Sequence, residues 1–322
     1  LNSFLKETYY SKKIKIEERI EKFLRKKVDL GNYSGIRFLG ISLLNPTIID
    51  PEDINSKIIA NRVYVGIMPI QSFLNQKWIF KIRPEKTEFN IDRDFFKRNE
   101  PNVYKKNKKS KIKYELNFNL SEYSTLRFKD LGVKTKVKGV VKYKSNLRQI
   151  IGNVKSKSER KGSLKVKLNT KLNDNFIKLQ VFSRGVNLGN SKYNVGNRKF
   201  EVKRGKFKAN FKFYKSLNKT FCRGRFSLNG LILNTLDLAE NINNDSASFF
   251  CEDNNLKANF KKLNYGTLTS GLILNIPLNK SMNKIDLRGS VGYLNSLNPD
   301  IKLSGNIPYW FDKRGIKFGN ID

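Results

Sequence analysis

Apolar and polar residues alternate at every step along residues 198–233. Within 207–213 the odd positions are apolar and the even positions are Lys or Asn, and a period of two is typical of a β-strand with one buried face. Phe200 and Val202 alternate in the same way before a Lys-Arg-Gly-Lys run at 203–206, whose glycine favours a hairpin turn. The pattern therefore predicts strands with an apolar face that must be covered by something.

The same alternation fills most of the chain after residue 114. Leu, Val, Ile and Phe alternate with Lys and Asn in 164–168, 256–260 and 301–305. Before residue 92 the alternating runs are shorter and are bounded by Pro, Gly and Asn, which predicts a β-meander.

Helical spacing of apolar residues is confined to 11–27. Ile16, Ile20, Phe23 and Leu24 recur at three- and four-residue intervals, with Lys, Arg and Glu between them, and this predicts one amphipathic helix. Its basic face would suit an anionic membrane surface. Capping the end of a sheet is the interpretation that we favour.

These patterns divide the chain into four expected segments. Residues 97–113 are rich in Lys, which indicates a solvated basic linker rather than a phosphate-binding patch. The chain begins at Leu1 and ends at Asp322 within β-like sequence, so we expect it to be part of a longer protein. The segments are an N-terminal helix and lead-in (1–30), a β-meander (31–96), the linker (97–113) and a repetitive β-region that continues beyond the chain end (114–322).

The net charge of +36 predicts attraction to polyanions such as nucleic acid, phospholipid headgroups or acidic polysaccharide. Lys, Asn and Ile are all used heavily, as in proteins encoded by an AT-rich genome. Such a genome explains part of the charge equally well, without any binding function. The chain has no histidine, which excludes every catalytic triad or metal site that needs imidazole. We therefore expect no enzymatic activity, no metal site and no cofactor.

The remaining candidates for chemistry are two cysteines and a few carboxylates. Cys222 and Cys251 both lie in strand-like runs, so buried free thiols are preferred over a disulfide formed in an oxidising compartment. Acidic residues cluster at 50–53 and at Asp92 and Asp94. Ion pairs with the abundant lysines explain these clusters better than acid–base catalysis.

Several blocks of the chain carry a family resemblance. They are residues 24–31 with Gly35-Ile36 and 39–41, residues 60–74, residues 83–94, and the Tyr265-Gly266 region at 262–271. These blocks look like TamB-like proteins of cyanobacteria, which belong to the AsmA-like group of bridge-like lipid-transfer proteins. Phe95 and Phe96 depart from the Gly and Trp that this family often has there.

Alternation alone leaves two all-β architectures open: a sandwich or barrel with a dry core, or an open trough. The resemblance implies the second, an elongated, twisted antiparallel sheet curled into a U-shaped hydrophobic groove. Phospholipid acyl chains would lie along its wall. The candidate wall residues are Leu164, Val166, Leu168, Phe200, Val202, Phe207, Phe211, Phe213, Phe226, Leu228, Leu256 and Phe260. Each of them could equally be an ordinary core residue.

The resemblance implies phospholipid transport between an inner and an outer membrane, with the protein in the periplasm and its inner-membrane anchor outside this segment. A second hypothesis is the assembly or translocation of outer-membrane proteins with an Omp85-type barrel as partner. The third is nucleic-acid binding through charge. We do not expect it, because Lys and Phe alternate on opposite faces, whereas a stacking platform needs both on one surface.

Overall fold

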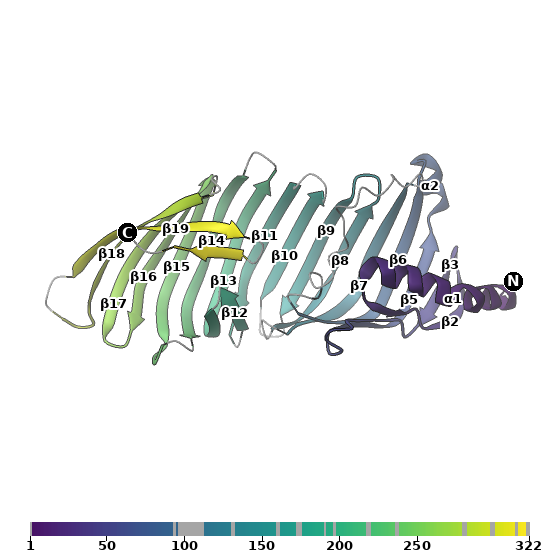
Figure 1. The fold of residues 1–322 in the computed structure, drawn as a ribbon, viewed down its shortest axis with the longest axis horizontal. Helices are drawn as coiled ribbons and strands as arrows, with labels where there is room; N and C mark the ends of the chain where they lie inside the picture. Colours follow the sequence, from purple (N-terminus) through teal and green to yellow (C-terminus); the bar gives the residue numbers. More distant parts are fainter. Residues whose placement is uncertain are drawn as a thin grey trace. The chain divides into compact units, whose positions relative to one another are not determined.

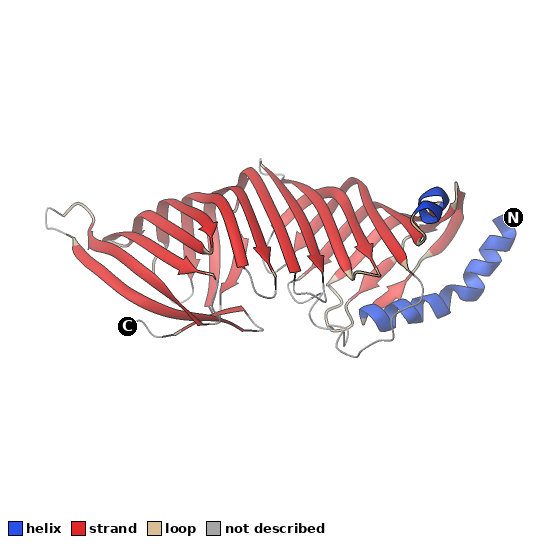
Figure 2. Ribbon diagram, turned by 90° about the horizontal axis from the view of Figure 1, so that it is seen from above, coloured by secondary structure: helices blue, strands red, loops and turns tan. Residues whose placement is uncertain are grey.

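In a computed structural model of the chain, two compact units are present, unit 1 (Leu1–Ser156) and unit 2 (Lys157–Asp322). Strands dominate both units (Figures 1 and 2), so the predicted all-β class is confirmed. The structure describes residues 2–92, 95, 113–129, 133–158, 162–171, 176–189, 191–195, 198–216, 220–235, 238–278, 282–296, 300–312 and 315–319.

Unit 1 holds both helices of the described residues and the shorter strands. The elements are α1 (Asn2–Leu24), β1 (Lys27–Asp29), β2 (Asn32–Arg37), β3 (Gly40–Leu44), β4 (Thr47–Ile49), β5 (Lys57–Ile67), α2 (Pro69–Leu74), β6 (Trp78–Ile91), β7 (Tyr114–Phe128), β8 (Val133–Lys144) and β9 (Gln149–Ser158). Strand β9 ends at Ser158, two residues beyond the boundary between the units.

Helix α1 is confirmed, and it begins at Asn2, well before the predicted start. It makes polar contacts with β1 and with Gly31, which follows β1. The Tyr9 hydroxyl donates to the carbonyl of Gly31 (2.9 Å), and Lys13 pairs with Asp29 (2.8 Å). Burial raises the pKa of Tyr9, which keeps its hydroxyl a proton donor. The helix thus packs against a strand, as the capping interpretation expects.

Two features of unit 1 differ from the expectation. The sheet is mixed, because β6 and β7 pair in parallel; residues 92–113 between them are long enough for the crossover that parallel strands require. The predicted linker 97–113 lies outside the described residues except for Lys113.

The second difference is a short helix, α2, that was not predicted. It begins with Pro69 at its first turn, a position that proline favours.

Unit 2 consists of antiparallel strands, each paired with its neighbours along the sheet. They are β10 (Ser163–Lys171), β11 (Phe176–Asn187), β12 (Ser191–Val195), β13 (Arg198–Lys215), β14 (Thr220–Thr235), β15 (Ile242–Asp253), β16 (Asn255–Tyr265), β17 (Leu268–Pro277), β18 (Met282–Tyr293), β19 (Ile301–Asp312) and β20 (Gly315–Phe318).

The hairpin predicted at residues 203–206 is wrong, because β13 runs straight through these residues. Its pairing with β14 shifts register on both sides of Arg204, as at a β-bulge. Gly205 is buried on the same side of the sheet as Val202. An added Cβ would lie 3.0 Å from Leu231 Cδ1 and 3.6 Å from Val202 Cγ1. A larger residue would therefore crowd Leu231, and the bulge keeps Val202 on the same side as Phe207 despite their opposite parity.

Candidate functional site: an apolar sheet face in unit 2

The twelve predicted wall residues lie on β10, β13, β14 and β16 of unit 2. Residues paired directly across an antiparallel ladder point to the same side of the sheet, and the register brings the predicted residues onto one side. We call this side the apolar face. Three of its rows are Val166–Val181–Phe211–Gly224–Cys251–Leu256–Ile276, Ala209–Phe226–Phe249–Ala258–Leu274–Leu287 and Phe207–Leu228–Ala247–Phe260–Leu272.

A ladder of phenyl rings forms the centre of the apolar face. The ring of Phe226 stacks on that of Phe249 with 4.3 Å between centroids, and Phe249 meets Phe260 edge to face at 5.6 Å. Phe211 on β13 packs against Phe226 with 5.8 Å between centroids, on the side of Phe226 away from Phe249. Strands are about 4.8 Å apart, so the ladder extends about 14 Å across β13 to β16. This length is close to the thickness of one leaflet, which is half of a bilayer hydrocarbon core about 30 Å thick.

Phe249 is the central residue that sequence reasoning left out of the wall. It alternates with exposed Phe250 and follows Ala247, so the same period-two signal marks it. Other residues of the face that were not predicted carry this signal as well. They are Leu179, Val181, Leu272, Leu274 and Leu287.

Most of the wall side chains are only half-buried. Of the twelve predicted residues, Val202 is the buried one, at 4% exposed, and the others retain part of their accessible surface. Side chains in a sealed sandwich core would be buried throughout. Both helices of the described residues belong to unit 1, so no described helix of unit 2 covers this face.

Strand β19 contacts the end of β17 through one buried tyrosine. Tyr309 is 1% exposed and its hydroxyl donates to the carbonyl of Pro277, the last residue of β17. Tyr309 has the same parity along β19 as Ile307, which pairs with buried Ile285. Burial raises the pKa of Tyr309, so the phenol stays neutral and adds no charge beside the apolar face.

The opposite side of the unit 2 sheet is basic. Lys208 and Lys212 on β13 pair with Ser227 and Arg223 on β14, and all four residues have the parity opposite to the phenyl ladder. On β13 and β14, alternation therefore places positive charge on one side of the sheet and apolar side chains on the other.

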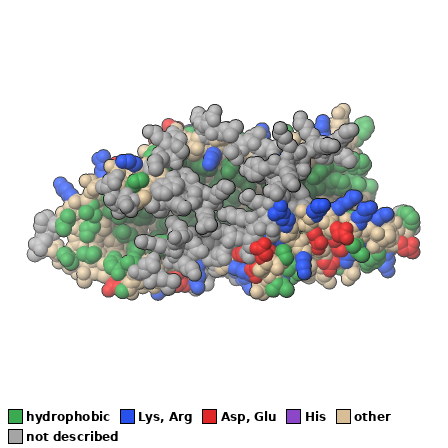
Figure 3. All heavy atoms as spheres, viewed as in Figure 1, with side chains coloured by type: hydrophobic (Ala, Val, Ile, Leu, Met, Phe, Trp, Pro, Cys, Tyr) green, Lys and Arg blue, Asp and Glu red, His purple; other side chains and the backbone are tan. Residues whose placement is uncertain are grey.

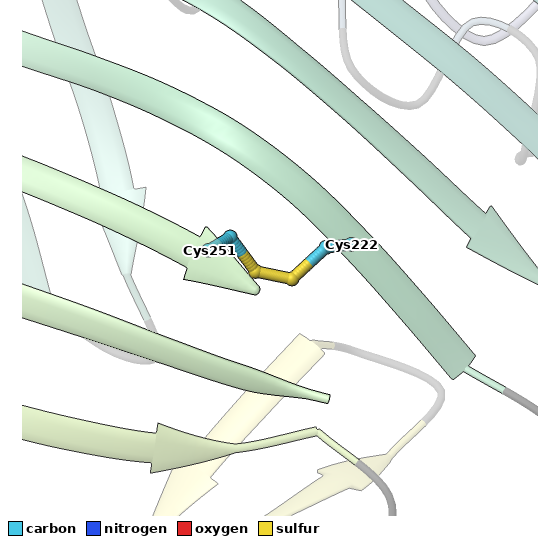
Figure 4. The surroundings of a disulfide bond; sticks show 2 residues. All are labelled: Cys222 and Cys251. Atoms are coloured by element: carbon cyan, nitrogen blue, oxygen red, sulfur yellow. A yellow bond between two sulfur atoms is a disulfide. The ribbon is translucent and has the colours of Figure 1, made fainter. Parts of the chain in front are cut away.

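Cys222 and Cys251 form a disulfide on the apolar face (Figure 4), which corrects the expectation of free thiols. Both cysteines are buried, at 0% and 1% exposed. They lie diagonally across β14 and β15, because Gly224 is the residue paired with Cys251. Their Cα atoms are 5.6 Å apart, within the range that a disulfide spans. The sequence could not show this, since it does not give the register.

We expect loss of this disulfide to destabilise unit 2. Replacing both cysteines with serine removes a crosslink between residues 29 positions apart, and a crosslink of this size contributes about 2–4 kcal/mol to the free energy of unfolding. Denaturant unfolding of the wild type, with and without a reductant, and of the double variant measures the difference. The reductant should affect the wild type alone; equal unfolding free energies of the two proteins without reductant would contradict the expectation.

Two of the acidic residues considered for catalysis, Asp50 and Asp53, make ion pairs. Asp50 lies 3.0 Å from Lys26, and Asp53 lies 3.0 Å from Lys129. Asp94 is outside the described residues. In the part of the chain that the structure describes, no three Cys, Asp or Glu side chains form a group that could hold a metal ion.

Comparison with known proteins returns no relative: no family model matches the chain, and no curated protein or solved structure is significantly similar to it. Within the described residues, neither helix has the combined length and hydrophobicity needed to cross a bilayer.

Proposed function

We propose that this chain is part of a non-catalytic phospholipid carrier of the TamB-like, AsmA-like type, with the apolar face of unit 2 as the lipid-binding surface. The observation that supports this most directly is a continuous apolar face that crosses many strands while its side chains stay half-buried. Large apolar surfaces left partly exposed on a folded chain commonly bind an apolar ligand.

The energetics favour both binding and movement. Each CH₂ group of an acyl chain removed from water contributes about 0.8 kcal/mol. Each row of the apolar face runs across successive strands, and every strand contributes similar apolar side chains to it. A tail that moves by one strand therefore exchanges one set of contacts for a similar set. The binding free energy then largely cancels between neighbouring positions, and the lipid can slide along the face while its headgroup stays in water.

The disulfide agrees with the location that this function requires. Disulfides persist in oxidising compartments such as the bacterial periplasm, where a carrier between inner and outer membranes would work. The separation of Lys and Phe on opposite faces of β13 argues against the nucleic-acid hypothesis, because bases cannot stack on rings that face away from the cations.

The direct test is native mass spectrometry of the chain purified without detergent. We expect phospholipid to remain bound, and we expect a delipidated sample to take up added phospholipid. A preparation that carries no lipid and takes up none would contradict the proposal, since an apolar face of this size should retain acyl chains.

A further inference from the structure

A second apolar surface lies in unit 1, at the end of the sheet that carries α2. We call it the α2 patch, and it consists of Phe38 and Leu39 at the β2–β3 turn and Ile70, Phe73 and Leu74 on α2. Phe38 is 89% exposed and Phe73 is 84% exposed. Figure 3 shows hydrophobic side chains gathered at this end, where Figure 1 places α2. Monomeric proteins rarely leave such a group of large apolar side chains in water.

The backbone around the α2 patch is held in place. The amide of Ile67 donates to the carbonyl of Leu39 (3.0 Å), and the Tyr64 hydroxyl donates to the carbonyl of Phe38. On the other side of the patch, the Ser72 hydroxyl accepts the amide of Ile79 (2.9 Å). The turn and the helix are therefore fixed to the sheet by hydrogen bonds, and the fold presents these side chains to the outside.

Basic residues surround the α2 patch. A hollow of about 660 Å³ between the turn and α2 is lined by Phe38, Leu39 and Ile70 together with Arg37, Lys81 and Arg83. The nearby carboxylate of Glu85 is shared by Arg37 (3.5 Å) and Arg62 (4.0 Å). Three cations thus line the hollow, and one of them, Arg37, shares its carboxylate with Arg62, so positive charge is in excess beside the exposed apolar side chains.

We propose that the α2 patch inserts into the surface of an anionic lipid bilayer. Exposed aromatic and aliphatic side chains with a basic rim match the boundary between acyl chains and anionic headgroups. The rim is the reason for choosing a bilayer over a protein partner, because many phosphates can face the cations at once. This inference does not depend on lipid transport by unit 2, since a peripheral membrane contact requires no lipid-carrying groove.

The chain contains its own control residue at the other end of β5. Ile54 is 73% exposed in the turn between β4 and β5, whereas α2 follows the opposite end of β5. An aspartate at either position introduces the same charge at a similarly exposed apolar side chain. Phe73→Asp and Ile54→Asp therefore differ in whether the α2 patch is altered.

The test is co-sedimentation of the full chain with phosphatidylcholine vesicles, with and without phosphatidylglycerol. We expect wild type and Ile54→Asp to bind the anionic vesicles, and Phe73→Asp to bind at least about tenfold more weakly. Phe73→Ser, which adds no charge, should also bind more weakly. The variant Trp310→Phe leaves Trp78 as the one tryptophan of the chain. Trp78 is 54% exposed beside α2, so brominated lipids should quench its fluorescence.

Several outcomes would overturn the proposal. They are equal vesicle binding by Phe73→Asp and wild type, equal losses in Phe73→Asp and Ile54→Asp, and salt-sensitive binding without quenching, which indicates adsorption by charge alone. Circular dichroism identifies a variant that has unfolded, and Phe73→Ser then serves as the test. Phe73→Asp should retain co-purified phospholipid, so failure of this inference and failure of the lipid-carrier proposal give different results.

Discussion

We expect Phe249→Glu to reduce the phospholipid bound by the chain about tenfold. Phe249 lies at the centre of the phenyl ladder, stacked on Phe226 and in edge contact with Phe260. The substitution removes a contact worth about 1.5–3 kcal/mol and places a charge beside the acyl chain. Each 1.4 kcal/mol corresponds to a factor of ten in affinity. Native mass spectrometry with a titrated phospholipid measures the change.

The matched control is Phe250→Glu, one residue further along the same strand. Phe250 points to the opposite side of the sheet and is 52% exposed, so the same substitution there should leave lipid binding unchanged. Phe249→Gln separates loss of the ring from addition of charge and should show an intermediate loss. If Phe249→Glu is folded and binds as much lipid as Phe250→Glu, the apolar face is not the binding surface.

The largest effect on stability is expected from Asp50→Ala in unit 1. Asp50 is fully buried and lies 3.0 Å from Lys26, which is 5% exposed. The substitution leaves an ammonium group buried without this carboxylate, and such losses cost about 3–5 kcal/mol. For a unit of this size the thermal midpoint should fall by roughly 10 °C. Differential scanning calorimetry gives the midpoint of each variant.

Asp53→Ala is the control, because Asp53 also lies 3.0 Å from a lysine, Lys129, but both side chains are 25% exposed. Its loss should cost less than about 1 kcal/mol. Hydrogen bonds from Ser56 and Lys129 lower the pKa of Asp53 from 3.8 to about 2. Its contribution is therefore present above pH 3.8 and is lost as the pH falls through 2. If Asp50→Ala is no less stable than Asp53→Ala, the buried pair does not stabilise unit 1.

Much of unit 2 could be predicted because its strands place apolar side chains on one side and mostly polar or charged side chains on the other. The period of two assigned the twelve wall residues to one face without knowledge of which strands are neighbours, and it also marks Phe249. The bulge between Val202 and Arg204 could not be predicted in this way. A bulge changes parity through pairing with another strand, and no local pattern records that partner.

Unit 1 shows where local patterns are insufficient. The helix around Ile16 was predicted from apolar spacing, yet α1 contacts Gly31 through Tyr9 and β1 through Lys13. Polar side chains on a charged helix give no periodic signal that separates contact from solvent. The α2 patch was also missed, because exposure of Phe73 depends on what the rest of the fold leaves uncovered.

Alternation of side chains dictates that this chain forms strands with one hydrocarbon side and one basic side, because successive residues of a strand point in opposite directions whatever the neighbours are. The tertiary structure decided which strands lie side by side, that Cys222 and Cys251 come within bonding distance, and that β6 and β7 run parallel. These features depend on contacts between residues distant in sequence, and such contacts are set by the balance of packing over the whole unit rather than by any local run of residues.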